Sequence, residues 1–361
     1  MQPSLAHRQN DQEAIERHRL FGLLEAEIDD ALTTLSGTAP LMMTMARYHL
    51  GLTDSSGEPT TPEIRQAVQG KRIRPLLAMY SAAAVGGRVE EAAPVAAGIE
   101  LLHNFTLIHD DIQDRSPNRR YRPTVWRIWG NAQAINAGDA LFAAAQLALL
   151  RTNGTTASPS LVVRLIEAFN TTTIDIVRGQ VHDLENEGRP NVTPEDYLTM
   201  IAGKTAAIVR YSAWAGALVG GAPDEIADKL GQVGEAIGMG FQLRDDMLGI
   251  WSPAAVTGKD AADDIRRRKQ SLPILILRAR ASEEDTTRLN ALFSQEEIGP
   301  EGVLEVLALL TKYDVEETMT VQVGDAHTRA MTILNEALPN QANAAVDSLK
   351  TLVTQLSVRI S

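Results

Sequence analysis

Two clusters of aspartate are the residues best suited to chemistry in this chain. Asp110, Asp111 and Asp114 form the segment DDIQD, and Asp245 and Asp246 stand much later, in FQLRDDMLGIW. Carboxylates one helical turn apart repel each other unless a cation lies between them. Magnesium suits such positions, because it takes one or two carboxylates, keeps several waters and completes its octahedron with phosphate oxygens. The clusters therefore predict an enzyme that holds metal-bound diphosphate.

Basic residues beside the first cluster support this interpretation. Arg119 and Arg120 follow it in the segment SPNRRYRPTVW. A guanidinium group can bind phosphate through two parallel hydrogen bonds. The alternatives are a surface salt-bridge loop for the arginines and a solvated helix end for DDIQD, since Asp-Asp pairs recur in this chain. The closeness of the acidic and basic segments favours diphosphate binding.

The spacing around both clusters predicts helices that carry them. Before the first cluster, an apolar face carries Leu101, Phe105, Ile108 and Ile112. A polar face carries His103, Thr106, Asp110 and Asp114. In the later segment, one face carries Gln242, Asp245, Asp246 and Gly249. We expect the two helices to face each other, so that their aspartates line one cavity.

The composition predicts one all-α bundle. The chain has 361 residues, of which 44% are hydrophobic and 4% aromatic, and stretches rich in Ala and Leu outnumber β-branched alternating runs. We find no internal repeat and no interdomain linker, so we expect a single domain over residues 1–361 with its motifs within about 62–280. The helical segments predicted by periodicity are Gln12–Thr34, Pro62–Val85, Glu90–Asp114, Asn136–Leu150, Ser160–Glu187, Thr193–Val219 and Asp224–Ile250.

Charge and composition exclude several classes of protein. A net charge of −12 argues against a nucleic-acid partner, because such proteins meet phosphates with Lys and Arg patches. With no cysteine, there is neither a disulfide nor a thiolate metal site, so any metal must bind oxygen or imidazole. The N-terminal segment lacks a secretory apolar core, and no stretch approaches the roughly 20 apolar residues of a membrane span. We therefore expect a cytoplasmic protein without an integral membrane segment.

Five separated blocks resemble one known family. They are GKRIRP from Gly70, LLHNFTLIHDDIQDRSPNRR from Leu101, GQVHDLENE from Gly179, GKTA from Gly203, and FQLRDDMLGIW with the following GKDAADDIRRRKQSLP. In this order they resemble the trans-isoprenyl diphosphate synthases, the polyprenyl synthetase family. The resemblance implies an isoprenoid-synthase-type helical bundle with a central cavity and a homodimer packed through helices.

The resemblance also implies a reaction and its substrates. An allylic diphosphate ionises, and its carbocation alkylates the double bond of isopentenyl diphosphate in head-to-tail prenyl transfer. Three Mg²⁺ ions per active site would bind the allylic diphosphate, because metal ions draw charge onto the departing group. The implied metal ligands are Asp110, Asp111, Asp114, Asp245 and Asp246. The implied cations on the allylic diphosphate are Arg119, Lys204, Lys259 and Lys269.

Other positions match the second substrate and the cation. Gly70, Lys71, Arg74, His103 and Arg120 match the family's isopentenyl diphosphate site, which has cations and no aspartate. Thr205, Gln180 and Gln242 match positions where neutral oxygens face the developing cation. For these three, the alternative is a polar side chain that bonds a neighbouring helical turn.

The residues before DDIQD bear on product length. Phe105 stands five residues before Asp110, Thr106 stands four before, and DDIQD has no two-residue insertion. In the resembling family, residues here form the floor of the pocket for the growing chain, and this pattern resembles geranylgeranyl diphosphate synthases. We predict mainly a C20 product from C5 to C15 primers. The alternative products are farnesyl or longer-chain diphosphates, and the alternative role of Phe105 is that of a core residue.

Some positions depart from the family's pattern. Gly249 stands where many relatives have a third aspartate, Asp260 and Ala262 replace the usual Pro and Gly after Lys259, and Tyr121 replaces a common glycine. Two other functions are open, a class I terpene cyclase and a non-catalytic subunit of a heteromeric synthase. The cyclase's NDxxSxxxE motif is not found, and the aspartates and lysines that such subunits lose are present.

Overall fold

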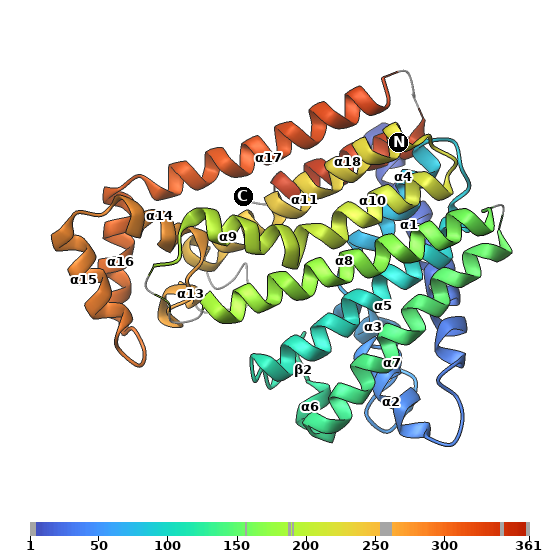
Figure 1. The fold of residues 1–361 in the computed structure, drawn as a ribbon, viewed down its shortest axis with the longest axis horizontal. Helices are drawn as coiled ribbons and strands as arrows, with labels where there is room; N and C mark the ends of the chain where they lie inside the picture. Colours follow the sequence, from blue (N-terminus) through green and yellow to red (C-terminus); the bar gives the residue numbers. More distant parts are fainter. Residues whose placement is uncertain are drawn as a thin grey trace. The chain divides into compact units, whose positions relative to one another are not determined.

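The computed structural model describes residues 5–155, 157–186, 189, 191–252, 262–339 and 343–358. These residues are mainly helical, as predicted (Figure 1). The first helices are α1 (Leu5–Thr33), α2 (Pro40–His49), α3 (Pro62–Gln69), α4 (Ile73–Ala84), α5 (Val89–Gln113), α6 (Val125–Trp129) and α7 (Asn131–Leu150), followed by the 3₁₀ turn η1 (Arg151–Gly154). The middle of the chain forms α8 (Pro159–Asn186), α9 (Pro194–Ile201), the π-helical turn η2 (Ala202–Ala206), α10 (Ala207–Val219) and α11 (Asp224–Trp251). The last helices are α13 (Asp263–Arg266), α14 (Leu272–Arg280), α15 (Glu283–Phe293), α16 (Pro300–Lys312), α17 (Val315–Ala337) and α18 (Ala344–Val358). Strands β1 (Asn118–Arg119) and β2 (Arg122–Pro123) form a small antiparallel hairpin.

The described residues divide into two compact units, each built from separate stretches of sequence. Unit 1 comprises the described residues of Met1–Asn170, Tyr211–Leu230 and Leu338–Leu349. Unit 2 comprises those of Thr171–Arg210, Gly231–Ala337 and Lys350–Ser361. The boundaries fall inside α8, α10, α11 and α18, so these four helices contribute residues to both units.

The core of unit 1 is centred on α5. This helix packs most extensively against α7, and also against α4 and α1. Residues Ala92 to Leu102 of α5 are buried, and α7 contributes buried small side chains such as Ala137, Ala144 and Ala148. Alanines let helices pack closely with little loss of side-chain entropy. Because α5 is fixed along its length, its C-terminal end holds the first aspartate cluster in place.

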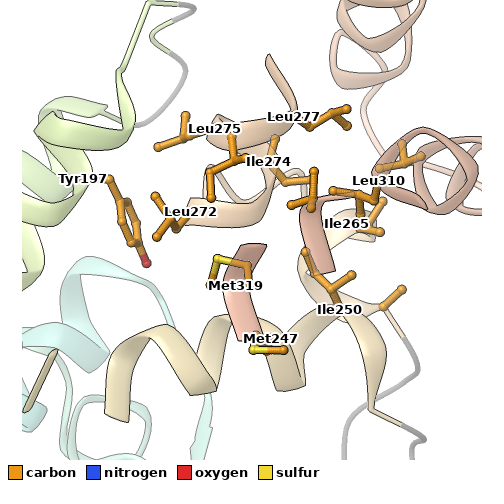
Figure 2. Close-up of a cluster of buried hydrophobic side chains, with 14 of the residues drawn as sticks. Tyr197, Met247, Ile250, Ile265, Leu272, Ile274, Leu275, Leu277, Leu310 and Met319 are labelled. Carbon is orange, nitrogen blue, oxygen red and sulfur yellow. The ribbon is translucent and has the colours of Figure 1, made fainter. Parts of the chain in front are cut away.

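The core of unit 2 surrounds α14, which packs against α9, α16 and α17. Leu272 to Leu277 are all buried. Figure 2 shows Leu272, Ile274, Leu275 and Leu277 in one apolar cluster with Tyr197, Met247 and Ile265. Each fully buried Leu or Ile contributes roughly 1.5–3 kcal/mol. Leu243, Met247 and Ile250, which flank the second aspartate pair in sequence, belong to this apolar cluster.

Each predicted helical segment is confirmed, with two interruptions. Pro62–Val85 forms two helices, α3 and α4, because Gly70 (φ 66°) and Arg72 (φ 48°) take left-handed conformations. Thr193–Val219 contains the π-helical turn η2 between α9 and α10. Neither feature changes the apolar periodicity, so the pattern does not reveal it. In the part of the chain that the structure describes, no helix has the length and apolar character of a membrane span.

Candidate active site

The first aspartate cluster lies at the C-terminal end of α5, in unit 1. Asp110 is half-buried, Asp111 is buried and Asp114, the C-cap, is exposed. Because a helix C-terminus carries partial negative charge, carboxylates there are unfavourable without a nearby cation. The cluster is therefore suited to binding a positive ion.

Arg119 provides a cation for the central aspartate of the cluster. Its Nε donates to both Asp111 oxygens at 2.9 and 3.1 Å, and its Nη2 lies 2.9 Å from Asp111 Oδ1. Burial raises the pKa of Asp111 to about 6, although the charge of Arg119 acts in the opposite direction. Asp111 is thus already paired with a guanidinium group, and Asp110 and Asp114, which are one turn apart and less buried, are more accessible to a metal ion.

A tight turn fixes the two arginines that follow the cluster. Arg119 belongs to β1, and Arg120 and Tyr121 form the turn of the hairpin with φ of 49° and 64°. Two residues with positive φ characterise a type I′ hairpin turn, where glycine is favoured at low cost. Tyr121 fills the position where the family often has glycine and is 92% exposed. The hairpin keeps its shape with Tyr121 at that position.

Arg120 lies in a second cluster of unit 1, which is rich in cations. Its Nη1 donates to the Val68 carbonyl at 2.5 Å, and its guanidinium lies against Gly70, where a Cβ would approach it to 3.3 Å. Arg74 Nη1 is 3.3 Å from His103 Nε2. Burial, then the charge of Arg74, lower the pKa of His103 well below its usual value, so this imidazole is neutral. Lys71 is exposed beside them. The residues Gly70, Lys71, Arg74, His103 and Arg120 are thus neighbours in a cationic cluster suited to an anion.

Two glycines in unit 2 bring α8 against the turn η2. A Cβ at Gly179 would collide with the backbone nitrogen of Lys204, and a Cβ at Gly203 would meet the Asp175 carbonyl at 2.7 Å. This close approach sets Lys204 beside α8, where its Nζ donates to Asp183 Oδ2 at 2.5 Å. The blocks GQVHDLENE and GKTA therefore form one contact, and their glycines explain why two distant segments position one lysine.

Thr205 begins a chain of polar side chains in unit 2. Its Oγ1 donates to Gln242 Oε1 at 3.1 Å, and Gln242 Nε2 donates to Asp246 Oδ1 at 3.2 Å. The Tyr197 hydroxyl donates to the other Asp246 oxygen at 2.6 Å. Burial, with the charge of Asp246, raises the pKa of Tyr197 well above its usual value, so this phenol stays a donor. The network orients Gln242, with its carbonyl oxygen on the side of Thr205.

Lys269 completes this network. Its Nζ lies 3.8 Å from Asp246 Oδ1 and 3.5 Å from Asp264 Oδ2. Burial alone lowers the pKa of Lys269, but the charges of Asp246 and Asp264 outweigh burial and the net shift is upward. Asp264 fills the space next to Gly249, since a Cβ there would collide with its carboxylate. Gly249, which stands where many relatives have a third aspartate, therefore leaves room for the carboxylate of Asp264.

Comparisons with known proteins identify the family of the chain. The family model described as "Polyprenyl synthetase" matches residues 62–310, which is more than half of the chain. The chain belongs to the polyprenyl synthetase family.

Relatives of this chain carry different product names. A (2E,6E)-farnesyl diphosphate synthase of Mycobacterium bovis is 42% identical over 235 residues, covering 65% of this chain and 63% of its own length. The chain thus matches less than two thirds of that relative. A geranylgeranyl diphosphate synthase of Mycobacterium tuberculosis is 38% identical over 310 residues, covering 86% of this chain and 83% of its own length.

Solved structures support the all-α fold of this chain. A polyprenyl synthetase from Streptomyces coelicolor A3(2) matches with a TM-score of 0.84 and 33% identity, covering 94% of this chain and 98% of that one. A geranylgeranyl pyrophosphate synthetase from Pyrococcus horikoshii Ot3 matches with a TM-score of 0.82 and 31% identity, covering 96% and 99%. The predicted fold class is therefore confirmed.

The predicted metal ligands of the chain differ in their surroundings. Asp245 is exposed, whereas Asp246 has 0% exposure and contacts Tyr197, Gln242 and Lys269. A metal ion would have to displace these partners, so the structure favours Asp246 as a residue that positions Gln242 and Lys269. Among the described residues, no three or more carboxylate or imidazole side chains are grouped to hold a metal ion. Asp110 and Asp114 nevertheless fit Mg²⁺, because that ion needs one or two carboxylates besides water and phosphate.

The other residues named from the sequence lie as follows. Gln180 is buried on α8 in unit 2, and Thr106 on α5 donates to the His103 carbonyl at 2.8 Å. The Phe105 ring packs against His109 at 4.7 Å and Phe142 at 5.2 Å, centroid to centroid. Lys259 and Asp260 lie outside the described residues. Ala262, where the family has glycine, takes a left-handed φ of 58°, which is the conformation that a glycine adopts easily.

Sequence reasoning did not single out Tyr197 or Asp264. Tyr197 precedes Lys204 by seven residues, about two helical turns, and this spacing could have linked it to the GKTA block. Asp264 belongs to an acidic pair, and its contact with Lys269 depends on tertiary packing. Its position in the sequence therefore does not indicate a role in the site.

The contact between α8 and η2 gives a prediction. Gly179→Ala should destabilise the protein by about 1–3 kcal/mol, because the added methyl group meets backbone atoms that cannot move aside. Urea unfolding measures this loss. The matched control is Gly324→Ala on α17, where the space around the glycine is open, and it should leave stability unchanged or raise it by up to about 1 kcal/mol. A Gly179→Ala protein as stable as the unmodified chain would contradict the close contact.

Proposed function

We propose that the chain catalyses Mg²⁺-dependent head-to-tail prenyl transfer between an allylic diphosphate and isopentenyl diphosphate. The observation that carries this proposal is that unit 1 contains a metal-type carboxylate site and an anion-binding cationic cluster next to each other. Carboxylates suited to a metal stand at the end of α5, and Arg119 links them to the cationic cluster of Arg74, His103 and Arg120. One diphosphate must be activated by metal and the other left intact, and adjacent sites of these two kinds serve both needs.

The residues take distinct roles in this proposal. Asp110 and Asp114, with Asp245, would hold Mg²⁺, which draws negative charge onto the departing diphosphate. Arg119, Lys204 and Lys269 would bind the same leaving group, and fixed cations stabilise charge as it develops. Asp111 keeps Arg119 oriented, and Asp246 does the same for Gln242 and Lys269. The proposal requires Asp110 and Asp245 to bind metal on the same diphosphate.

Neutral oxygens would stabilise the allylic cation. Thr205 and Gln242 are bonded to each other, and the buried side chain of Gln180 comes from α8 of the same unit. Such oxygens interact favourably with a cation without forming a lasting covalent bond to it. The allylic C–O bond then breaks, the double bond of isopentenyl diphosphate forms the new C–C bond, and a proton leaves.

We further propose that the main product is C20 and that the chain acts as a homodimer. Relatives named for both C15 and C20 products are similar to it, so a farnesyl product is the alternative. For the dimer, a face of α8 exposes apolar side chains spaced at i, i+3, i+7 and i+10. These residues are Ile174, Val177, Val181 and Leu184. Such spacing gives a narrow apolar stripe of the kind that packs against another helix.

Purified chain alone tests the proposed function. With Mg²⁺ and isopentenyl diphosphate, each of the C5, C10 and C15 allylic primers should give mainly C20 product, because the pocket and not the primer sets the final length. Light scattering of the same sample should give the mass of a dimer. A chain that binds diphosphates without condensing them would instead be a non-catalytic subunit, and C15 alone or chains beyond C25 would contradict the C20 assignment.

Phe105 gives a second prediction. If its ring limits the growing chain, Phe105→Ala should shift the product to longer chains, because the ring and its contacts with Phe142 and His109 are removed. Chromatography of the dephosphorylated products measures the distribution. Phe293→Ala on α15 is the control, since that ring packs beside Arg278. An unchanged distribution in Phe105→Ala would place the floor elsewhere.

A further inference from the structure

The loop between α3 and α4 contains two residues with a left-handed backbone. Gly70 (φ 66°) and Arg72 (φ 48°) stand on either side of Lys71. Glycine adopts this conformation freely, whereas a residue with a side chain is strained in it. The Arg72 carbonyl accepts the first backbone hydrogen bond of α4, from Leu76 at 3.2 Å. The conformation of Arg72 therefore sets the start of the helix that carries Arg74.

Two residues of the N-terminal helix α1 hold the side chain of Arg72. Arg72 Nη1 donates to Glu25 Oε1 at 3.0 Å, and the guanidinium lies 5.6 Å from the centroid of the Phe21 ring. The side chain of Arg72 is 3% exposed. A buried guanidinium that loses its carboxylate becomes an uncompensated charge, so the ion pair with Glu25 keeps Arg72 in its strained conformation.

The same helix also contacts the rest of the loop. Glu25 Oε2 lies 3.9 Å from Arg65 Nη1 on α3. Arg17, about two turns before Glu25, donates through Nη2 to the Lys71 carbonyl at 3.3 Å. The contacts of α1 thus reach the helix before the loop, the middle of the loop and the residue that starts α4. They fix the backbone from which Lys71 and Arg74 project.

The charge of Glu25 also offsets that of Arg72 beside the cationic cluster. Burial lowers the pKa of Arg120, the charge of Glu100 acts in the opposite direction, and the charges of Arg119 and Arg72 add to the lowering. Arg72 is therefore close enough to repel the cluster. Because its guanidinium is paired with Glu25, Arg72 serves as a link between α1 and the loop.

We propose that Glu25 is a positioning residue for isopentenyl diphosphate, which acts through Arg72 to hold Lys71 and Arg74 ready for the diphosphate group. Groups that are ordered before the ligand arrives bind more tightly, because less freedom is lost on binding. The inference rests on the proposed function for the identity of the ligand. It gives a role in substrate binding to α1, a helix that contains none of the motif blocks.

Glu25→Gln removes the charge and keeps the size of the side chain. It should raise KM for isopentenyl diphosphate roughly tenfold, because Lys71 and Arg74 lose their fixed positions. KM for the allylic primer and kcat should stay unchanged. The matched control is Glu27→Gln on the same helix, since Glu27 pairs with Arg151 at 3.0 Å and is 25% exposed, against 28% for Glu25. Thermal stability should fall by similar amounts in both variants, and KM should rise in Glu25→Gln alone. An equal rise in both, or a lower KM in Glu25→Gln, would overturn the proposal.

Arg72→Gly tests whether Glu25 acts through Arg72. Glycine accepts the left-handed conformation, so this variant allows the same backbone and removes the link to α1. It should raise KM for isopentenyl diphosphate at least as much as Glu25→Gln does. The double variant should bind no more weakly than Arg72→Gly alone, because both changes remove one contact. Effects on KM that multiply in the double variant would show that the two residues act independently and would contradict the proposal.

Binding of inorganic diphosphate without Mg²⁺, measured by calorimetry, gives a readout independent of catalysis. It should weaken in Glu25→Gln and persist in Glu27→Gln. Equal binding by Glu25→Gln and the unmodified chain, or no binding by either, would count against the positioning role. If the unmodified chain shows no prenyl transfer and diphosphate binding still depends on Glu25, the proposed function fails and the role of Glu25 stands.

Discussion

The ion pair of Asp111 and Arg119 joins the two halves of the site in unit 1. It ties the end of α5 to the hairpin, and the hairpin in turn sets Arg120 against Gly70. Removing one partner of a buried ion pair leaves an uncompensated charge and costs several kcal/mol. Arg119 is one third exposed, so it can turn toward a ligand while Asp111 restrains it. The positions of the metal-type carboxylates and of the cationic cluster both depend on this contact.

In unit 2 the buried carboxylate of Asp246 orients neighbouring side chains, as Asp111 orients Arg119 in unit 1. Asp246 has no exposed surface, and burial raises its pKa although Lys269, Tyr197 and Gln242 act in the opposite direction. These partners make the charge tolerable inside an apolar core that includes α14. The consequence is a glutamine and a lysine with fixed side chains. In each of the two predicted metal-binding pairs, one aspartate is exposed or half-buried and the other is buried. In the proposed function the first binds metal and the second orients neighbouring side chains.

Much of the fold followed from the sequence, because apolar periodicity reports which face of a helix is buried. It predicted α5 and α11, and the motif blocks predicted the cluster of Gly70, Arg74, His103 and Arg120. The sequence did not separate the roles of Asp110 and Asp111, because the two aspartates have the same chemistry and differ in their packing alone. The π-helical turn η2 and the room that Gly249 gives to Asp264 also depend on tertiary contacts. Residue type and spacing thus predict metal-bound diphosphate chemistry, the motif blocks identify the family, and packing distinguishes the surroundings of individual residues.

The central claim is that carboxylates from two distant segments hold Mg²⁺ on one diphosphate. A crystal structure of the protein with Mg²⁺ and inorganic diphosphate tests it most directly. The account predicts that Asp110 and Asp114 bind metal on one side of the diphosphate, that Asp245 binds metal on the same molecule, and that Arg119, Lys204 and Lys269 contact its oxygens. Metal and diphosphate bound apart from each other, or a diphosphate whose metals contact neither Asp110 nor Asp245, would contradict it.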